Sequence, residues 1–502
     1  MTDGSSEAIG VVLSKGDTPN PFAYHFQVEE EVSLHLNDFV VVPTSEGDIL
    51  GKVTNIAVSS DLYGDPKLLN FYRKQGRNVD DFYQLDLTHV ARVMVLSLLT
   101  GGEVGLASKP ACPGSPVVKA GRAHVKTYLR LHDGGLLLGS LYGQTSIPVS
   151  LSTDKLLPYH MAVLGTTGSG KSYTNGVLVE ECFARGISVV VFDPHGEYTV
   201  MAEDLATLAS KDGRADRVIR VLTPPAPFGR SSPPSSPSIL SRVPITLSLE
   251  EIPPDHLAEM LSCTDAQSDL LTMAFQEYVQ NVTEVTVEGL IEAVETYGKK
   301  YKFATNTVKA VLRRVYKLRS LWIIGDEVPL STITAPAGLT IIDLSSLDDE
   351  YTQRVLAAVV LVKLMQGAKR GEVSPTVLVV EEAHIFAPQQ ESTASKWVLR
   401  KIAREGRKFG LGLNLTSQRI VGLDKDMLSQ CNTKILLKID SRTDLDHLLP
   451  FLAISNQSEV EVISRLPQGH ALVTGFAVGS PTMVKVRKRL TTHGGSTPSF
   501  QQ

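Results

Sequence analysis

Cysteine is scarce in this chain of 502 residues, whose four cysteines stand far apart: Cys112, Cys182, Cys263 and Cys431. No two of them form a Cys-x-x-Cys pair, which excludes a zinc knuckle or a redox dithiol of that kind. A disulfide framework is typical of small secreted domains and is not expected in a chain of this length. We therefore expect a reducing compartment and predict a cytoplasmic protein.

Long apolar runs are missing as well. No stretch reaches the roughly 18 consecutive apolar residues that a transmembrane helix requires, so no membrane span is expected. The first ten residues, MTDGSSEAIG, lack the basic segment and the apolar core of a signal peptide. The apolar run from Val355 to Met365 is interrupted by Lys363 and predicts a buried helix.

A large excess of one charge is also absent. The 49 lysines and arginines nearly balance the 54 aspartates and glutamates, for a net charge of −5. This balance excludes a protein that coats nucleic acid by bulk charge, although it permits a local basic channel. With 42% hydrophobic and 21% charged residues, the composition is that of a folded globular protein, and the length predicts two to four domains.

Residues 1–150 have the pattern of a small β-domain. Short runs rich in aliphatic and aromatic residues recur there, separated by turn sequences such as Ser-Glu-Gly-Asp at 45–48. The runs are Ile9–Leu13, Phe22–Phe26, Phe39–Val42, Ile49–Val53, Val90–Leu99 and Leu136–Leu141. Such spacing favours a β-barrel or a sandwich, and we predict an N-terminal β-barrel.

In the rest of the chain, apolar runs alternate with longer helical stretches, which predicts an α/β fold with a parallel sheet. We assign residues 151–248 and 326–480 to the two parts of this core. Residues 249–325 have helical periodicity and are predicted to form a helical insertion. Residues 481–502 form a C-terminal extension whose polar end, TTHGGSTPSFQQ, is expected to fray. The Pro/Ser-rich segment 224–238 is predicted to be an exposed linker, and no function is assigned to it.

The sharpest motif is GTTGSGKS at 165–172, which matches the P-loop pattern GxxxxGK[ST] between an apolar strand and a helix. The glycine-rich turn directs backbone N–H groups at phosphate oxygens, and the helix N-terminus adds its dipole. Lys171 is expected to contact the β- and γ-phosphates of ATP, and the Ser172 hydroxyl to bind Mg²⁺. The predicted nucleotide-binding residues are Gly165, Thr166, Thr167, Gly168, Ser169, Gly170, Lys171, Ser172 and Tyr173.

Hydrolysis needs a carboxylate in addition, and an apolar strand ends in two of them, Glu381 and Glu382. Because side chains alternate along a strand, the two cannot point the same way. We expect Glu381 to hold Mg²⁺ through water and Glu382 to polarise the attacking water as general base. The alternative is an acidic pair that caps the following helix, and the P-loop upstream disfavours it.

Two more polar clusters follow apolar strands, and the carboxyl ends of parallel strands face the ligand crevice. Gln418 is predicted to sense the γ-phosphate or to orient water, the alternative being a simple turn that ends the strand. Asp193 is assigned to support Mg²⁺ or the attacking water. His195, close by, is predicted to be a packed structural histidine.

The helix predicted over 393–409 is rich in lysine and arginine, which usually marks a solvated face. An arginine just before the next core strand can also reach the γ-phosphate of a neighbouring subunit, and hydrolysis then depends on a ring. We assign this arginine-finger role to Arg407 in preference to Arg404.

Together and in this order, the motifs resemble the HerA family of hexameric DNA-translocating ATPases, relatives of FtsK. The resemblance rests on GTTGSGKS at 165–172, DPHGEY at 193–198, VVEEAH at 379–384, REGRKFGLGL at 404–413 and TSQR at 416–419. The β-rich part, the helical insertion and the C-terminal extension also lie where that family would have them. One departure is Glu381, because many P-loop enzymes have aspartate at this position.

The resemblance implies a RecA-like core, a homohexameric ring and ATP-driven movement along double-stranded DNA. It implies ATP and Mg²⁺ as cofactors, bound by Lys171 and Ser172, with Glu382 as the catalytic carboxylate and Gln418 as the sensor. It further implies a NurA-like nuclease as partner, docked on the barrel face of the ring, in the resection of DNA ends for repair.

Two other functions stay open beside this one. An ATP-gated scaffold that assembles a partner effector, as in anti-phage complexes, would use the same catalytic residues, and so would a conjugation- or secretion-type motor. DNA-stimulated turnover separates a motor from a scaffold, and its salt dependence separates phosphate contact from an indirect effect. The densest basic region, Lys299 to Arg319, is a candidate DNA contact, but we expect it to be a solvated outer face.

Overall fold

The computed structural model describes residues 7–14, 18–59, 74, 87–131, 134–214, 216–225, 239–261, 263–320, 323–452 and 457–495. The chain forms two compact units, Met1–Asp133 with Leu141–Ile147, and Gly134–Ser140 with Pro148–Gln502. The Pro/Ser-rich segment predicted at 224–238 lies outside the described residues, except for its first two residues.

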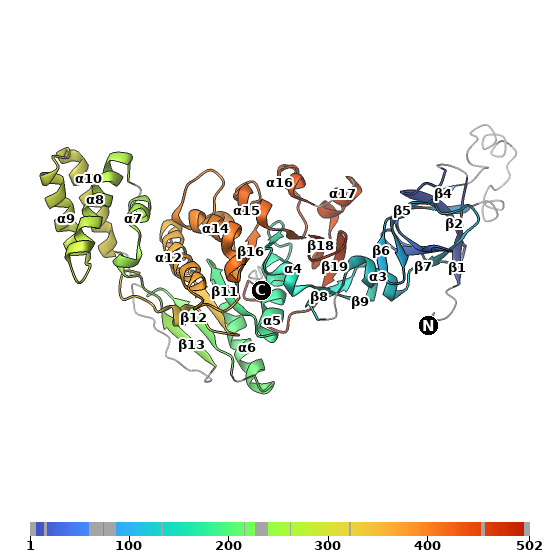
Figure 1. The fold of residues 1–502 in the computed structure, drawn as a ribbon, viewed down its shortest axis with the longest axis horizontal. Helices are drawn as coiled ribbons and strands as arrows, with labels where there is room; N and C mark the ends of the chain where they lie inside the picture. Colours follow the sequence, from blue (N-terminus) through green and yellow to red (C-terminus); the bar gives the residue numbers. More distant parts are fainter. Residues whose placement is uncertain are drawn as a thin grey trace. The chain divides into compact units, whose positions relative to one another are not determined.

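The first unit contains a closed antiparallel barrel (Figure 1). Six strands of its described part pair in the order β2-β1-β7-β3-β4-β5, and pairing between β2 and β5 closes the barrel. The strands are β1 (Ala8–Val12), β2 (Ala23–Val28), β3 (Phe39–Thr44), β4 (Gly47–Ser59), β5 (Thr88–Thr100) and β7 (Pro116–Lys119), with β6 (Glu103–Gly105) attached to β5. Alternate side chains, among them Phe26, Val40 and Val93, make the buried core, so the predicted barrel is confirmed.

The second unit is built on a mixed sheet with the strand order β13-β12-β14-β11-β15-β16-β10-β17-β18-β19-β8-β9. Its strands are β8 (Leu136–Leu141), β9 (Gln144–Leu151), β10 (Met161–Leu164), β11 (Ser188–Asp193), β12 (Ile219–Thr223), β13 (Leu240–Pro244), β14 (Leu339–Asp343), β15 (Thr376–Val380), β16 (Leu411–Ser417), β17 (Thr433–Leu436), β18 (His470–Gly475) and β19 (Thr482–Val486). All pairs from β13 to β17 are parallel, and β18 and β19 continue the sheet antiparallel. The predicted parallel α/β core is therefore confirmed.

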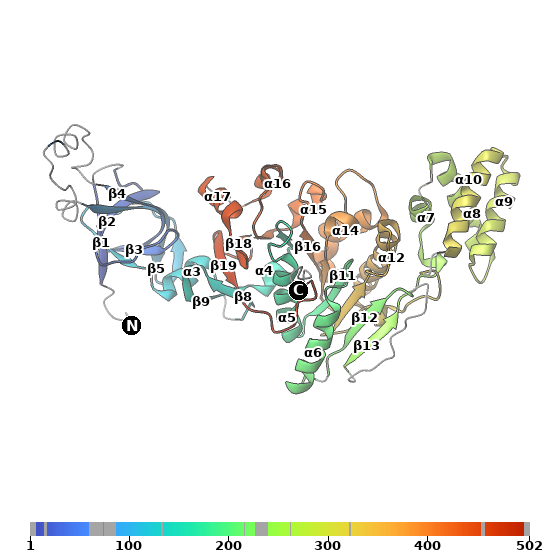
Figure 2. The same ribbon diagram turned by 180° about the vertical axis from the view of Figure 1, so that it is seen from behind.

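Helices cover both faces of this sheet. The chain crosses the sheet in one direction from β10 through β11 to β12, and in the other from β14 through β15 to β16. Right-handed crossovers then place α5 (Lys171–Ala184) and α6 (Thr199–Lys211) on one face, and α12 (Glu350–Lys369) and α14 (Ala394–Glu405) on the other (Figure 2). Within the described residues, no helix has both the length and the apolar character that crossing a bilayer requires.

Between β13 and β14 the chain leaves the sheet to form the helical insertion. Its helices are α7 (Pro254–Met260), α8 (Asp265–Asn281), α9 (Val287–Lys300) and α10 (Thr305–Tyr316). Each of the longer ones is amphipathic and turns its apolar side inward, where Phe275, Leu290 and Val311 are buried. The insertion thus packs as a small helical bundle (Figure 1).

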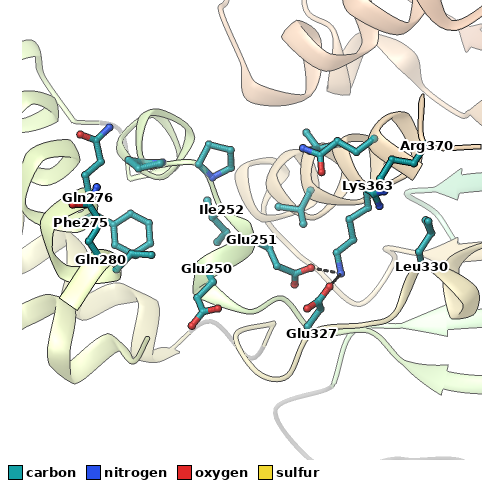
Figure 3. Close-up of a pocket in the computed structure, with 16 residues that line it drawn as sticks. Glu250, Glu251, Ile252, Phe275, Gln276, Gln280, Glu327, Leu330, Lys363 and Arg370 are labelled. Atoms are coloured by element: carbon teal, nitrogen blue, oxygen red, sulfur yellow. Dashed lines mark ion pairs between the residues drawn. The ribbon is translucent and has the colours of Figure 1, made fainter. Parts of the chain in front are cut away.

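The two ends of the insertion are fixed to each other and to α12. Lys363 of α12 pairs with Glu251 on the incoming chain and, at 3.0 Å, with Glu327 on the outgoing chain. The backbone joins the same two ends, since the Leu247 N–H donates to the Ile323 carbonyl at 2.6 Å. Figure 3 shows the three charged side chains at the wall of a cavity of about 550 Å³ between α8 and α12.

The fold differs from the sequence-based expectations at the boundary of the N-terminal domain and at the end of the chain. Leu136–Leu141, assigned by its pattern to the N-terminal domain, is β8 of the large sheet. Pattern reasoning identifies a strand but not its sheet, because pairing partners are chosen by the tertiary fold.

The polar end of the chain does not fray over 491–495, the part that the structure describes. Thr491 is 6% exposed and hydrogen-bonds to the buried Glu180 of α5.

Candidate active site

The P-loop connects β10 to α5 at the carboxyl edge of the sheet. Gly168 and Gly170 have φ angles of 75° and 102°, left-handed conformations that glycine adopts without strain. The loop is also fixed from the neighbouring chain segment, because the Thr166 N–H donates to the Lys438 carbonyl at 2.8 Å. Inside the loop, the Ser169 hydroxyl donates to the Thr166 carbonyl at 2.7 Å. The predicted glycine-rich turn therefore has a defined conformation ahead of a helix N-terminus.

Lys171 is the first residue of α5 and is only 7% exposed. Its Nζ donates to the Thr166 carbonyl at 3.0 Å, and it forms no ion pair within the described residues. Burial lowers the pKa of its ammonium group, and the negative charges of Glu382, Glu381 and Glu197 raise it by a smaller amount. A buried cation whose hydrogen bond goes to a loop carbonyl is well placed to receive an anion such as a phosphate.

Glu381, directly after β15, is buried and tied to the P-loop helix. Its Oε1 accepts hydrogen bonds from Asn175 Nδ2 at 2.8 Å and from the Tyr198 hydroxyl. Asn175 stands one turn after Lys171 on α5, and Asn414 of β16 donates to its Oδ1 at 2.8 Å. Burial raises the pKa of the Glu381 carboxyl to about 7. Water-mediated Mg²⁺ binding by Glu381 stays a prediction.

Glu382 leaves the strand in a left-handed conformation, with φ 47° and ψ 48°, and precedes α13 (Ala383–Phe386). This conformation is rare outside glycine and costs on the order of 1–3 kcal/mol, and such strain clusters at functional sites. Burial raises the pKa of Glu382, opposed by Lys171 and His195. Its Oε2 is buried with no hydrogen-bond partner among the described residues. His384 Nδ1 lies 3.2 Å away, but burial lowers the pKa of that imidazole to about 4, which leaves the ring neutral near pH 7.

Gln418 follows β16 and lies between the P-loop and Glu382. Its Oε1 accepts a hydrogen bond from the Thr167 hydroxyl, and its backbone N–H donates to the Glu382 carboxylate. The neighbouring Ser417 hydroxyl lies 3.2 Å from Nδ1 of His384. The residue predicted to be the sensor is therefore linked both to the phosphate loop and to the candidate catalytic carboxylate.

Asp193 holds the loop that follows β11. Its carboxylate accepts backbone N–H groups from His195 at 3.2 Å, Gly196 at 2.9 Å and Tyr198 at 2.8 Å. Burial raises its pKa to about 6. The geometry gives Asp193 a positioning role, since the loop that it holds brings the Tyr198 hydroxyl to Glu381; direct support of Mg²⁺ or water stays a prediction. His195, predicted to be packed, is instead exposed.

The two arginines weighed for the finger role differ in how they are held. The Arg407 guanidinium lies over the Tyr159 ring, 3.9 Å from its centroid. Arg404 is exposed, with its guanidinium 3.9 Å from the Asp426 carboxylate. Within the described residues, no hydrogen bond or ion pair joins either arginine to the P-loop of its own chain. Action of Arg407 on a neighbouring subunit stays a prediction.

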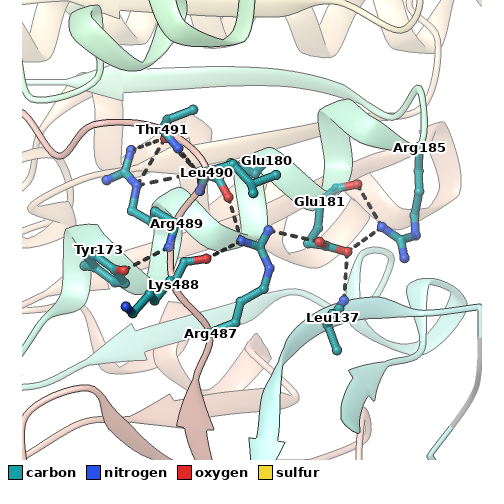
Figure 4. Close-up of polar contacts among 10 residues, drawn as sticks. All are labelled: Leu137, Tyr173, Glu180, Glu181, Arg185, Arg487, Lys488, Arg489, Leu490 and Thr491. Carbon is teal, nitrogen blue, oxygen red and sulfur yellow. Dashed lines mark hydrogen bonds and ion pairs between the residues drawn. The ribbon is translucent and has the colours of Figure 1, made fainter. Parts of the chain in front are cut away.

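The C-terminal segment packs along α5 and reaches the side chains of its outer face (Figure 4). Arg487 pairs with Glu180 at 2.8 Å and with Glu181 at 2.9 Å. The Arg489 N–H donates to the Tyr173 hydroxyl at 2.8 Å. Tyr173, predicted to bind nucleotide, thus has its hydroxyl engaged by the C-terminal segment.

The same segment continues toward the loop that Asp193 holds. The Thr492 N–H donates to Asp204 of α6 at 2.6 Å. Gly494 then lies so close to Glu197 that a Cβ on it would be 2.5 Å from the Glu197 carbonyl oxygen. The last described residues therefore connect the P-loop helix, α6 and the 193–198 loop.

The donor set fits a magnesium-bound nucleoside triphosphate. Lys171 supplies a buried cation, the P-loop supplies N–H groups at a helix N-terminus, and Glu382 supplies a buried carboxylate oxygen without a hydrogen bond. The hydroxyl of Ser172, next to Lys171, has no hydrogen bond within the described residues and is available to a metal ion. In the same residues, no group of three or more His, Cys, Asp and Glu side chains is placed to hold a metal ion by itself.

Sequence reasoning found the strand-end residues but missed the polar chain behind them. Asn175, Asn414 and Thr416 are all fully buried, and the Asn175 amide donates to the Thr416 hydroxyl as well as to Glu381. Two polar residues two positions apart in an otherwise apolar strand were a signal, because alternate residues of a strand share a face. Tyr198 carried no comparable signal, since the loop at 193–198 alone determines where its hydroxyl lies.

The strand order, the P-loop on β10 and the carboxylates on β15 define a P-loop NTPase of the RecA-like kind. The structure of VirB4 from Thermoanaerobacter pseudethanolicus has this fold. It matches with a TM-score of 0.52 and 17% identity, over 71% of this chain and 97% of that one.

Comparison with protein families leads to a particular group. Residues 136–364 match the model "Helicase HerA, central domain". The DNA double-strand break repair helicase HerA of Pyrococcus furiosus is 25% identical, over 96% of this chain and 92% of that protein. The probable DNA double-strand break repair helicase HerA of Methanocaldococcus jannaschii is 26% identical, over 94% of each. Residues 136–364 are therefore similar to the HerA central domain, and the chain is similar to the HerA helicases along nearly its whole length, as the motifs implied.

Proposed function

We propose that this protein is an ATP-driven translocase on double-stranded DNA that works as a homohexameric ring. The observation that supports it best is the meeting of Lys171, Glu382 and Gln418 at one edge of the sheet, where hydrogen bonds and charge link them. Similarity to proteins named DNA repair helicases over 94–96% of the chain supports DNA as the substrate.

Each group has a distinct task in the proposed reaction. Lys171 and the P-loop N–H groups would bind the triphosphate, and Ser172 with Glu381 would hold Mg²⁺, which would supply positive charge beside the phosphates. Glu382 orients the attacking water and accepts its proton. Its buried Oε2 has no hydrogen bond to give up before it binds that water.

Gln418 is suited to report the γ-phosphate. Its side chain touches Thr167 in the P-loop while its N–H donates to Glu382. Loss of the γ-phosphate therefore changes the surroundings of both contacts at once. In a ring, Arg407 of one subunit would complete the site of the next subunit and couple hydrolysis between neighbours.

A NurA-like nuclease is the proposed partner, docked on the barrel face of the ring in DNA end resection. The support is the homology to repair helicases together with a barrel that forms its own compact unit. The test is copurification of a NurA-like nuclease with the full chain, and its loss after exposed barrel residues such as Phe22 and Leu106 are changed to serine.

An ATP-gated scaffold is the second candidate. It is favoured by the same feature, a barrel that forms a unit of its own in addition to the ATPase core, and it needs no DNA for turnover. A conjugation-type motor is supported only by the similarity of the fold to that of VirB4.

The deciding experiment measures ATP hydrolysis with and without linear duplex DNA, on protein whose ring state is checked by light scattering. The translocase is expected to form a ring and to turn over faster with duplex DNA. Glu382→Gln should lower turnover by about 10²–10⁴-fold and retain ATP binding, whereas the exposed Glu295→Gln should behave as wild type. A ring whose turnover ignores DNA would instead support the scaffold.

A further inference from the structure

The charges of the helical insertion are separated along the chain. Residues 265–295 contain seven aspartates and glutamates and no lysine or arginine. Residues 296–325 contain eight lysines and arginines and no acidic residue. A solvated helical surface ordinarily mixes both signs, so an uninterrupted basic stretch in a chain of net charge −5 calls for a partner.

Part of this basic stretch is already engaged within the bundle. Lys300 pairs with Glu277 at 3.1 Å, and Arg319 pairs with Glu288 at 3.0 Å. Arg314 donates to a backbone carbonyl. These residues stabilise the bundle and are not available for contacts outside it.

The remaining cations gather on and near α10. Lys309 and Arg313 are exposed, stand one turn apart, and have no hydrogen bond or ion pair with any described residue. Asn306 and Tyr316, both exposed, lie on the same face, at a spacing of three, four and three residues along the helix. The opposite face of α10 is buried in the bundle, so the face that carries Lys309 and Arg313 remains exposed to solvent.

The composition of this face distinguishes between kinds of partner. Protein interfaces centre on buried apolar anchors, and no large aliphatic side chain is exposed in the described part of 299–320. Its exposed aromatic residues are Tyr301 and Tyr316, each with a cation over its ring. Surfaces that bind nucleic acid are polar and strongly basic. Two cations one helical turn apart, about 6 Å, are close enough to contact neighbouring phosphates of one strand.

We propose that the α10 face, formed by Asn306, Lys309, Arg313 and Tyr316, binds the phosphate backbone of double-stranded DNA. This surface is separate from the nucleotide site. The inference rests on the proposed function, because it adds a DNA contact to a DNA motor. Phosphate contact carries no sequence information, as a translocase requires. The insertion is also anchored to α12 through Lys363, so a load on this face acts directly on the ATPase core.

The test is the double variant Lys309→Ala/Arg313→Ala in the full chain. The control of equal charge is Lys211→Ala/Arg214→Ala, at the last residue of α6 and three residues beyond it. Affinity for a labelled random-sequence duplex is measured by fluorescence anisotropy at several salt concentrations. The double variant should bind about tenfold more weakly and lose about two units of the slope of log K against log salt, since each phosphate contact contributes about 0.9. Its ATP turnover without DNA should equal that of wild type.

Several results would overturn the inference. The inference fails if the double variant binds duplex DNA with the same affinity and salt slope as the control. It also fails if the double variant binds more weakly but with an unchanged salt slope. Loss of the ring in light scattering would assign the face to a second copy of the chain, and loss of polyglutamate binding with DNA binding intact would assign it to an acidic protein. If wild type itself binds no duplex, the proposed function fails, which is a separate result.

Discussion

The Thr491 hydroxyl donates to the Glu180 carboxylate across 2.7 Å, which attaches the last described part of the chain to the P-loop helix. The same Oε1 accepts the N–H groups of Leu490 and Thr491, each at 3.0 Å, and Oε2 accepts from Arg487 at 2.8 Å. Glu180 is 2% exposed, so it relies on the C-terminal segment for these contacts. A buried carboxylate with this many donors is stable only while the segment is in place.

Thr491→Val should lower the free energy of unfolding by about 1–2 kcal/mol, because it removes a hydrogen bond to a buried charged group without changing the size of the side chain. The measurement is urea unfolding of the full chain. Thr492→Val is the matched control, since that residue is exposed and, within the described residues, hydrogen-bonds through its backbone N–H. Equal effects of the two substitutions would contradict a specific role for the Thr491 hydroxyl.

The Glu381 carboxyl should make stability depend on pH. Its pKa is about 7 in the folded protein against an ordinary value of 4.5, so between these pH values the unfolded chain releases the proton while the folded one keeps it. Stability therefore falls as pH rises from 4.5 to 7. Wild type should lose on the order of 3 kcal/mol relative to Glu381→Gln across this window.

Urea midpoints of both proteins at pH 4.5 to 8 provide the measurement for Glu381. Asp193 and His160 also titrate with shifted pKa values, but they are present in both proteins and largely cancel in the difference. Parallel curves for wild type and Glu381→Gln would show that Glu381 keeps an ordinary pKa.

Lys363→Met should destabilise the protein by about 2–4 kcal/mol. The substitution keeps the length of the side chain but leaves Glu251, which is 9% exposed, as a buried charge that has lost its partner. Lys369→Met on the same helix is the control. Its partner Glu405 is 3.4 Å away and both side chains are about 40% exposed, so a change within about 0.5 kcal/mol is expected. A Lys363 variant as stable as this control would show that the insertion does not depend on the ion pairs at its base.

Arg407→Ala should reduce ATP turnover by about 10²-fold or more and leave nucleotide binding intact, because a finger arginine stabilises charge that develops only in the transition state. Arg404→Ala, with its long contact to Asp426, should stay near wild type. Mixed rings decide whether the action is between subunits. Lys171→Ala and Arg407→Ala subunits, each inactive alone, should recover turnover together, and no recovery would exclude a finger acting in trans.

Periodicity and local motifs were enough to predict the fold class and the outline of the active site. Apolar strands alternating with helices require a parallel sheet, and parallel strands present their carboxyl ends at one edge. For that reason Lys171, Glu382 and Gln418 could be placed together from three distant segments, and the contacts at Gln418 agree with this. These conclusions depend only on periodicity and on local motifs.

The tertiary structure alone decided the contacts that support this site. The Asn175 and Tyr198 hydrogen bonds to Glu381 join residues 206 and 183 positions apart, and the Thr491 bond to Glu180 spans 311 positions. No local pattern encodes such pairings, because a buried carboxylate is satisfied by whichever donor the packed chain brings within reach. The C-terminal segment looked like a fraying end for this reason: its polar residues have partners only after the sheet and α5 have formed.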